Sequence, residues 1–274
     1  MYSCGITGHA GILGKSIQKK LGFRFIKFNG DITNIKDVEK WISKNNFDYM
    51  IHLAAIVPTA NVEKNYLKSK KVNYVGTKNL INSLIKYKKK IKLFFFSSTS
   101  HVYRPKYQFI KLNENSLTKP YSKYGKTKLL AEQYIKKKLK KKVKFCIGRI
   151  FSFTHKNQDT SFVVPSLFKK IKKLKGKSIL LDNLNHYRDF ISTEDICSAI
   201  ELVLKKKVTG VLNIGVGKKI KLLEIASYFC KKFKVKLLSR VNQKPTFLIS
   251  NNQKLKNEGW KPKNNFFYEL RKFK

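Results

Sequence analysis

The order of apolar and polar positions divides the chain into short apolar runs and longer stretches with helical spacing. Runs of about four to eight apolar residues have the length of buried strands, whereas apolar residues that recur every three or four positions are typical of helices. The runs that predict strands lie at 2–7, 24–28, 48–55, 91–96, 143–150 and 211–217. The stretches that predict helices lie at 15–18, 35–43, 72–81, 121–132, 164–174, 195–205 and 222–233. This alternation predicts an α/β fold with a doubly wound parallel sheet, because right-handed crossovers place helices on both faces of such a sheet.

The pattern becomes less regular after Phe151. A polar loop, one helix and the short apolar run 179–181 follow, before the next helix begins near residue 195. We therefore expect residues 1–155 together with about 186–206 to form the sheet domain, and residues 156–185 together with 207–274 to form a smaller lobe. At 274 residues the chain is long enough to bury a full core in this arrangement.

Three glycines follow the first predicted strand. Gly8, Gly11 and Gly14 stand three residues apart, at the junction with the next helix. Glycines at this spacing allow a tight turn, let the backbone approach a pyrophosphate, and let the helix pack on the strand. The free N–H groups at the start of that helix also attract an anion. The alternative is a glycine-rich turn that binds no ligand.

Two further features extend this site. Asp31 follows the second predicted strand, 17 residues after Gly14, near the distance at which a carboxylate meets an adenosine ribose. The alternative is that Asp31 caps the helix predicted at 35–43. At the end of the third predicted strand, the small side chains of Ala54 and Ala55 leave room for a flat cofactor.

Hydroxyl groups gather at the end of the strand predicted at 91–96, where open α/β sheets bind their ligands. Ser97, Ser98 and Thr99 follow it directly. In the helix that begins near residue 121, Tyr124 and Lys128 are four positions apart and therefore share one face. The alternative for these two residues is an exposed pair in a lysine-rich chain.

The chain carries far more positive than negative charge: 60 Lys and Arg against 16 Asp and Glu, a formal net charge of +44. Only six of these are Arg, the residue favoured for bidentate contacts with phosphates and bases. We interpret the lysines, including the dense run at 136–144, as solvated surface residues. The alternative is attraction to nucleic acid, an anionic membrane surface or an anionic substrate. No RNA-binding aromatic motif or helix-turn-helix pattern supports a specific nucleic-acid partner.

Cysteine usage and the start of the chain favour the cytoplasm. The four cysteines form no C-x-x-C pair and no metal-ligand spacing with histidines, so that we expect no metal site and buried thiols in a reducing compartment. The first strand begins at residue 2, which leaves no room for a signal peptide. No apolar run approaches the length of a membrane span. We expect a cytoplasmic protein without a transmembrane segment.

In their order and spacing, these motifs resemble the extended short-chain dehydrogenase/reductases, in the nucleotide-sugar epimerase/dehydratase group. The resemblance covers almost the whole chain and is carried by Thr7-Gly-x-x-Gly-x-x-Gly14, Gly30-Asp-Ile32, His52-Leu-Ala-Ala55, Asn73-x-x-Gly-Thr77, Ser97-Ser-Thr-x-x-Val-Tyr103, Tyr124-x-x-x-Lys128, Arg188-Asp-Phe190, Asn213-Ile-Gly-x-Gly217 and Gly259-Trp-x-Pro262. It implies a Rossmann-type doubly wound parallel sheet that binds NAD or NADP, a smaller C-terminal substrate-binding lobe, a nucleotide-sugar substrate and a homodimer.

The resemblance also implies roles for individual residues. Thr99, Tyr124 and Lys128 would be catalytic. The residues that it places against the cofactor are Gly8, Gly11, Ile12, Gly14, Asp31, Ile32, Leu53, Ala54, Ala55, Asn73, Ser97, Tyr124, Lys128 and Phe151. The residues that it places against the substrate are Thr99, His101, Ser152 and Arg188, with Arg188 at the diphosphate.

The chemistry of tyrosine agrees with this assignment. A free Tyr has a pKa of about 10, which is too high for easy proton transfer at neutral pH. A nearby ammonium and an oxidised nicotinamide favour the phenolate and lower that pKa. We therefore expect Lys128 and a bound cofactor to lower the pKa of Tyr124. Thr99 would donate to the same sugar oxygen, while hydride passes between the nicotinamide and a sugar carbon.

One departure from the family concerns the two residues after Thr99. Dehydratases of this family carry an Asp-Glu pair there, whereas this chain has Ser100 and His101, so that 4,6-dehydration lacks its acid and base. In the related fucose synthases an acid–base Cys occupies the position of His101. An imidazole at this position either transfers protons or makes a hydrogen bond at the pocket wall.

A second departure concerns the substrate. The region 149–164 and the pair Asn183-Leu184 are similar to GDP-4-keto-6-deoxymannose reductases, but Ser152 stands where these have Asn and His155 where they have Gly. We predict an NAD(P)-dependent 4-ketoreductase of a 4-keto-6-deoxyhexose nucleotide. The alternatives are an NAD-dependent nucleotide-sugar 4-epimerase and a non-catalytic family member that binds polyanions. The choice between NAD and NADP stays open, because the second strand ends without an acid and Lys27 or Arg24 could contact a 2′-phosphate.

Overall fold

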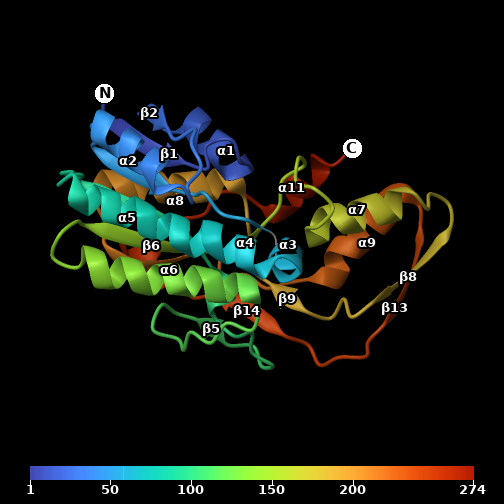
Figure 1. Ribbon diagram of the computed structural model, residues 1–274. Coiled ribbons are helices and arrows are strands. Elements are labelled where there is room, and N and C mark those ends of the chain that lie inside the picture. Colours follow the sequence, from blue (N-terminus) through green and yellow to red (C-terminus); the bar gives the residue numbers. More distant parts are fainter. Residues whose placement is uncertain (58) are drawn as a thin grey trace.

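The computed structural model describes residues 1–57 and 59–274. Its centre is a six-stranded parallel sheet (Figure 1). Across the sheet, the strands lie in the order β2 (Arg24–Lys27), β1 (Ser3–Thr7), β3 (Tyr49–His52), β4 (Leu93–Thr99), β6 (Phe145–Ile150) and β11 (Gly210–Ile214). All neighbouring strands in this sheet are parallel, which confirms the predicted sheet type.

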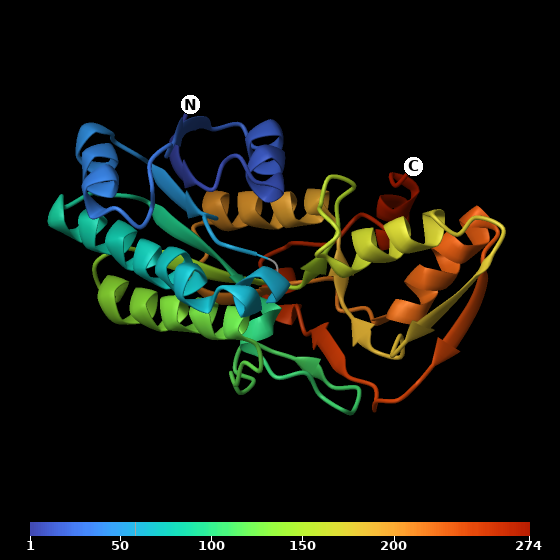
Figure 2. The ribbon, with the colours of Figure 1, turned by 45° about the vertical axis from the view of Figure 1, so that its right-hand side comes forward.

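Helices cover both faces of the sheet (Figure 2). On one face lie α2 (Ile35–Lys44), α5 (Gly76–Lys86) and α6 (Lys123–Leu139), and on the other lie α1 (Ile12–Lys20) and α8 (Thr193–Lys206). In β4, Phe94 and Phe96 pack with the first group of helices and Phe95 packs with the second. A strand covered on both sides needs apolar residues at consecutive positions, because successive side chains point to opposite faces. This is why the apolar runs predict the central strands.

The strand order places a crevice between β1 and β3. Counted along the chain, the six strands lie in the order 2-1-3-4-5-6. Open α/β sheets bind ligands at the carboxyl ends of the strands, where the order reverses. One strand lies outside β1 here, whereas the dinucleotide-binding order 3-2-1-4-5-6 has two. The sheet is therefore doubly wound, as predicted, with a narrower edge beside β1.

Strand β3 is shorter than the apolar run that predicts it. It ends at His52, whereas the run continues to Ala55. The reason lies in its neighbour: the last residue of β1 is Thr7, which pairs with His52, and no strand ladder continues beyond that pair. Residues 53–55 therefore form a loop at the carboxyl edge of the sheet.

The segment between β3 and β4 is helical but not uniform. It contains α3 (Thr59–Lys64), α4 (Tyr66–Lys70) and a π-helical turn, η1 (Lys71–Val75), before α5. The helix predicted at 72–81 thus begins inside the π-helical turn. Asn73 in this turn is buried, and its side-chain amide bonds both the N–H (2.7 Å) and the carbonyl (3.2 Å) of Ile56. The turn therefore holds the loop that follows β3.

The smaller lobe, which contains α7 (Val163–Lys172) and α9 (Leu222–Phe233) in Figure 1, has an aromatic core of its own. The ring centroid of Phe168 lies 5.5 Å from that of Phe229 and 5.3 Å from that of Phe273. The helices of this core are α7, α9 and α11 (Phe266–Arg271). Three small sheets accompany them: β8 (Ser178–Asp182) with β13 (Lys236–Arg240); β7 (Ser152–Phe153) with β10 (Phe190–Ile191); and β12 (Ile220–Lys221), β9 (Tyr187–Arg188), β14 (Phe247–Ser250) and β5 (Lys111–Leu112), in that order.

The predicted boundary of the smaller lobe is wrong for two segments. Residues 207–274 were expected in that lobe, but β11 pairs with β6 in the central sheet. Leu255 of α10 (Gln253–Asn257) and Trp260 also pack in the core beneath α1 and α8. Residues 210–214 and the segment from Leu255 to Trp260 therefore belong with the sheet domain, which the length and hydrophobicity of these elements do not reveal.

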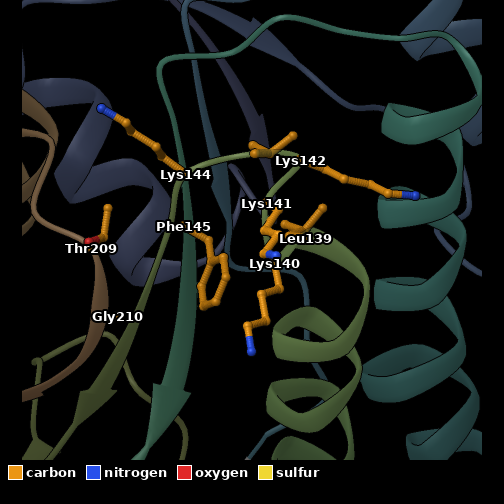
Figure 3. A pocket seen from close by; sticks show the side chains of 9 residues that line it. Leu139, Lys140, Lys141, Lys142, Lys144, Phe145, Thr209 and Gly210 are labelled. Atoms are coloured by element: carbon orange, nitrogen blue, oxygen red, sulfur yellow. The ribbon is translucent and has the colours of Figure 1, made fainter.

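The lysine-rich end of α6 borders a hollow of about 460 Å³, where β6 and β11 begin (Figure 3). Its lining comprises residues 139–145 with Thr209 and Gly210. The amino groups of Lys140, Lys142 and Lys144 point away from one another (Figure 3). They do not converge on one ligand position, which agrees with the interpretation of this run as solvated surface lysines.

Three expectations from the sequence concern membrane-spanning helices, metal sites and the cysteine thiols. In the part of the chain that the structure describes, no helix combines the length and the apolar content that crossing a bilayer requires. The same residues contain no cluster of three or more His, Cys, Asp and Glu suited to a metal ion. All four cysteines are free and buried, which confirms the prediction for the thiols.

Candidate active site

A cavity of about 880 Å³ opens at the carboxyl edge of the central sheet. The turn between β1 and α1, the loop after β3, the end of β4, the start of α6 and the segment after β6 contribute to its lining. The candidate residues from the sequence that line it are Gly8, Gly11, Ile12, Gly14, Leu53, Ala54, Ala55, Ser97, Thr99, His101, Tyr124, Lys128, Phe151, Ser152 and Arg188. Asp31, Ile32 and Asn73 are not among its lining residues.

Asp31 lies in the loop after β2, where its exposed carboxylate stabilises the loop itself. The carboxylate accepts hydrogen bonds from the N–H (2.8 Å) and the hydroxyl (2.9 Å) of Thr33, and the backbone bond is the main cause that lowers the pKa of Asp31. The N-cap of α2 is Asn34, whose side chain accepts from the N–H of Lys36 at 3.0 Å. The alternative interpretation of Asp31 as the helix cap is therefore wrong. Ile32 is buried in the core that contains α2 and α5.

Close backbone contacts require the glycines of the first turn. Gly8 has a φ of +70°, and a Cβ on it would lie 2.6 Å from the backbone nitrogen of Ala54. A Cβ on Gly14 would overlap the carbonyl oxygen of Gly8. Gly11 is the N-cap of α1, and no side chain caps this helix. The turn therefore joins the loops after β1 and β3 and presents the N–H groups of a helix N-terminus to the cavity.

Strand β4 and helix α6 bring three candidate catalytic side chains together. Thr99 is the last residue of β4, and Tyr124 lies in the first turn of α6. The side chain of Thr99 lies close enough to the Tyr124 hydroxyl to lower the pKa of this phenol. Lys128 lies one helical turn beyond Tyr124, and its Nζ atom is 4.2 Å from the centre of the Phe96 ring. All three side chains line the cavity.

The start of α6 is fixed by its cap and by a glycine. The hydroxyl of Ser122, the N-cap, accepts a hydrogen bond from the N–H of Gly125 at 3.1 Å. A Cβ on Gly125 would overlap the carbonyl oxygen of His101. The first turn of α6 therefore packs directly on η2 (Ser100–Val102), the 3₁₀ turn that follows β4. This close packing holds Tyr124 beside Thr99.

Burial dominates the protonation of Tyr124 and Lys128. It raises the pKa of Tyr124 to about 12, although the neighbouring Thr99 side chain lowers it. It lowers the pKa of Lys128 to about 7, although the charge of Glu132 raises it. The lowering that we expected for Tyr124 is therefore not found in the protein alone, because the loss of hydration outweighs the effect of neighbouring groups. The phenol is protonated at neutral pH.

A buried ion pair that the sequence analysis missed lies behind Lys128. Glu132 accepts hydrogen bonds from Nη2 (2.8 Å) and Nε (3.1 Å) of Arg149, and Ser98 donates to it at 2.5 Å. The side chains of Arg149 and Glu132 are only 2% and 0% exposed. The one available signal was the spacing, since Glu132 follows Lys128 by four residues on the same helix.

Arg149 also links the central sheet to the segment around β5. Its Nη1 donates to the hydroxyl of Tyr103 (2.8 Å) and to the carbonyl of Glu114 (3.1 Å). Tyr103 donates in turn to the side chain of Asn213 in β11 at 2.8 Å, and burial raises the pKa of Tyr103 to about 12. The motif residues Tyr103 and Asn213 thus belong to a buried polar network beneath the cavity lining.

Arg188 reaches the cavity from β9. Its Nη1 donates to the carbonyls of Tyr187 (2.7 Å) and Thr246 (3.0 Å), which holds one arm of the guanidinium in place. The adjacent Asp189 has a structural role: its carboxylate accepts from the N–H groups of Val216 (3.0 Å) and Gly217 (2.9 Å). The Arg-Asp-Phe motif therefore combines a cavity side chain with a carboxylate that anchors the neighbouring loop.

His52 is a structural histidine. Its Nδ1 lies 2.6 Å from the hydroxyl of Thr7, and its Nε2 lies 2.9 Å from the hydroxyl of Thr77. Burial lowers the pKa of His52 to about 3, so that the ring is neutral. It connects β1, β3 and α5 beneath the glycine turn.

Comparison with known proteins agrees with this geometry. The sequence profile of the NAD dependent epimerase/dehydratase family matches residues 4–215. GDP-6-deoxy-D-talose 4-dehydrogenase of Aggregatibacter actinomycetemcomitans is 31% identical over 239 residues, which cover 82% of this chain and 78% of that protein. RMD from Pseudomonas aeruginosa, solved in complex with NADPH, aligns with a TM-score of 0.87 at 21% identity over 99% of this chain and 97% of its own. The UDP-glucose 4-epimerase of Thermus thermophilus, solved with NAD, aligns with a TM-score of 0.86 at 20% identity over 98% of this chain and 96% of its own.

The two solved structures establish the likeness of the fold. The family profile covers more than half of the chain, and the dehydrogenase relative exceeds 30% identity over most of both proteins. The family profile and this relative match the chain in sequence, and not only in fold. The chain therefore belongs to the NAD dependent epimerase/dehydratase family, a family of enzymes that modify nucleotide sugars.

Proposed function

We propose that the chain is a 4-ketoreductase of a 4-keto-6-deoxyhexose nucleotide and that it binds NADH or NADPH in the cavity. The observation that carries this proposal is the protonated Tyr124 phenol, which lies with Thr99 and Lys128 in a cavity whose described lining contains a single carboxylate, Asp159. Reduction of a ketone begins with a protonated acid, whereas oxidation of an alcohol begins with a base. The similarity to a GDP-6-deoxy-D-talose 4-dehydrogenase supports the substrate class.

The lining residues fit a dinucleotide. The backbone of Gly8, Gly11 and Gly14 and the N-terminus of α1 would hold the pyrophosphate. Leu53, Ala54 and Ala55 would flank the cofactor, and Lys128 with Tyr124 would lie at the nicotinamide ribose, near Ser97, Ile12 and Phe151. Asp31 and Ile32 are proposed for the adenosine end, and Asn73 would act by holding the loop after β3. When bound, a reduced nicotinamide supplies hydride to a carbonyl carbon.

The register between β2 and β1 limits which basic side chain of β2 could contact the 2′-phosphate of NADP. Lys27 pairs with Ile6, near the carboxyl end of β1, whereas Arg24 pairs with Ser3 at its amino end. Cofactors bind at the carboxyl edge of the sheet. Lys27 therefore stays a candidate for a contact with NADP, and Arg24 does not.

We assign the proton transfer to Tyr124. The carbonyl carbon of the sugar gains a hydride, and the carbonyl oxygen takes the phenolic proton of Tyr124. The ketone thereby becomes a secondary alcohol. Thr99 would donate a hydrogen bond to the same oxygen and hold it beside the phenol. The phenolate that remains is stabilised by the positive charge of Lys128, and it favours the ammonium form of Lys128 in return. Arg188 would bind the diphosphate of the substrate.

Turnover of defined nucleotide sugars tests this proposal. We expect 4-keto-6-deoxyhexoses linked to GDP, UDP or dTDP to be reduced with consumption of one NADH or NADPH per sugar, followed by the absorbance of the reduced cofactor. Interconversion of UDP-glucose and UDP-galactose without net consumption would show a 4-epimerase instead. If no nucleotide sugar is turned over while RNA is bound with a steep salt dependence, the non-catalytic alternative gains support.

Gly14→Ala tests the position of the pyrophosphate. The added Cβ would overlap the carbonyl oxygen of Gly8, so that the turn must open. We expect NADPH binding to weaken at least about tenfold and the free energy of unfolding to fall by about 1–3 kcal/mol, as in other overpacked sites. Gly22→Ala is the control, because nothing lies within 4 Å of a Cβ at Gly22. Unchanged NADPH affinity in Gly14→Ala, measured by calorimetry, would place the pyrophosphate elsewhere.

A further inference from the structure

A row of aromatic rings lies on the four-stranded sheet of β12, β9, β14 and β5, on the face turned away from the cavity. On β9, Arg188 lines the cavity and its neighbour Tyr187 does not, because successive side chains of a strand point to opposite faces. The ring of Tyr187 stacks on that of Phe247 in β14, with centroids 4.7 Å apart and planes inclined by 7°. Phe109 extends the row, since its centroid lies 5.9 Å from that of Phe247.

The loop before β5 presents apolar side chains to solvent beside this row. Its first residue, Lys106, exchanges backbone hydrogen bonds of 2.9 Å and 2.7 Å with Phe247, and Lys111 after it also pairs with β14. Both ends of the loop are therefore held on β14, next to which β5 lies at the lower edge of the molecule in Figure 1. Between these ends, three large residues are about half exposed or more: Tyr107 (63%), Phe109 (47%) and Ile110 (50%). Such a group beside an aromatic row is typical of an interaction site.

Lysine ammonium groups lie over these rings. The Nζ atom of Lys219 is 4.7 Å from the centre of the Phe109 ring and 5.8 Å from that of Tyr187. The Nζ atom of Lys221 is 5.9 Å from the centre of the Tyr187 ring. We call this surface the basic–aromatic patch; its members are Lys106, Tyr107, Phe109, Ile110, Lys111, Tyr187, Lys219, Lys221 and Phe247.

The charge of the basic–aromatic patch is not balanced by acids of its own segments. The patch is formed by four segments: 104–113, 184–188, 216–223 and 241–250. None of them contains Asp or Glu, and no lysine of the patch forms a salt bridge with a described residue. The acids that border these segments, Glu114, Asp189 and Glu224, each accept a hydrogen bond from a backbone N–H group. The patch therefore suits an anionic partner with an apolar component.

We propose that the basic–aromatic patch docks the protein on a membrane surface that contains anionic lipids. The lysines attract the headgroups, and Tyr107, Phe109 and Ile110 enter the interfacial layer, where rings with a polar edge are favoured. The formal net charge of +44 adds attraction at longer range. Arg188 reaches the cavity from the other face of the sheet, so that docking leaves the cavity free for its ligands.

The geometry of the rings favours a bilayer over single-stranded nucleic acid. Bases bind to such surfaces by stacking on open faces of aromatic rings. Here the rings of Tyr187 and Phe247 stack on each other, and ammonium groups lie over Tyr187 and Phe109, so that few faces stay open to a base. A second copy of the chain does not suit the patch either. A twofold dimer through this face would bring two positive surfaces together, and like charges repel.

Vesicle binding tests the contribution of the lysines. The probes are vesicles of phosphatidylcholine alone and of phosphatidylcholine with about one third phosphatidylglycerol, and cosedimentation of the full chain gives the bound fraction. We expect binding to the mixed vesicles only, weakened by added salt. The patch variant Lys106→Gln, Lys111→Gln, Lys219→Gln should bind them at least about tenfold more weakly. The control variant removes the same charge from the end of α6, where the amino groups point away from one another (Figure 3): Lys140→Gln, Lys142→Gln, Lys144→Gln. It should lose less than about threefold.

A second set of variants tests the apolar contact. Phe109→Ser with Ile110→Ser keeps every charge and should weaken binding to the mixed vesicles about tenfold. The matched control, Leu67→Ser with Tyr268→Ser, removes side chains that are 79% and 56% exposed in α4 and α11, outside the patch, and should bind like the wild type. In Phe109→Trp, we expect brominated acyl chains to quench the emission of the new indole.

Three outcomes would overturn the inference. Equal losses in the two triple variants would mean that the overall charge, and not the patch, binds the lipid. Patch-dependent binding of single-stranded RNA without vesicle binding would identify a nucleic-acid partner instead. Vesicle binding without quenching in Phe109→Trp would leave the apolar loop outside the bilayer. None of the substituted residues lines the cavity, so that any turnover of nucleotide sugars should equal that of the wild type, and the inference stands or falls independently of the proposed function.

Discussion

Replacing Tyr124 with Phe is expected to slow ketone reduction between about a hundredfold and about ten-thousandfold, the usual contribution of a general acid. The substitution removes the phenolic hydroxyl beside Thr99, but it keeps the ring that contacts His101. Cofactor affinity should therefore change little. Single-turnover consumption of reduced nicotinamide measures the hydride-transfer step, and calorimetry with NADPH measures binding.

Tyr134→Phe provides a matched control on the same helix. The hydroxyl of Tyr134 donates to Asn82 at 2.6 Å and does not line the cavity. Its removal should leave the rate of reduction unchanged within error. A Tyr124→Phe variant that kept most of the wild-type rate would show that another group supplies the proton, and the proposed chemistry would fail with it.

The largest effect on stability is expected for Glu132→Gln. The substitution leaves the buried guanidinium of Arg149 without its counter-charge, since the two side chains are almost wholly enclosed. Breaking a buried ion pair from one side typically costs about 3–5 kcal/mol. We expect a loss of that size in the free energy of unfolding, measured by urea unfolding with circular dichroism. Because the charge of Glu132 raises the pKa of Lys128, the variant should also hold Lys128 more often in its neutral form.

Two variants show whether the loss comes from the unpaired charge. Glu39→Gln breaks an ion pair with Lys86 of 2.9 Å, in which the Lys86 and Glu39 side chains are 59% and 25% exposed, and it should cost at most about 1 kcal/mol. Adding Arg149→Met to Glu132→Gln removes the orphaned cation and should recover part of the lost stability. A loss in Glu132→Gln no greater than that in Glu39→Gln would mean that the pair does not stabilise the fold as described.

The sequence alone determined the features of this protein that depend on near neighbours. Apolar runs identify the central strands, because a strand buried on both faces must be apolar at consecutive positions. Gly8 and Gly14 identify the turn, because the backbone contacts there leave no space for a Cβ. Tyr124 and Lys128 share a helical face through their spacing, and Thr99 lies at the carboxyl end of a strand that the apolar run before it predicts.

The tertiary structure decided what depends on residues far apart in the chain. An apolar run does not state which strand it will join, so that the pairing of β11 with β6 appears only in the folded sheet. The partner of Glu132 likewise comes from another element. The pKa of Tyr124 depends on the whole cavity. The sequence suggested that Lys128 and a bound cofactor lower this pKa, but the surrounding elements exclude so much water that burial raises it in the protein alone. Hydration and pairing at a site are set by all the segments that enclose it, and that is why local sequence patterns do not predict them.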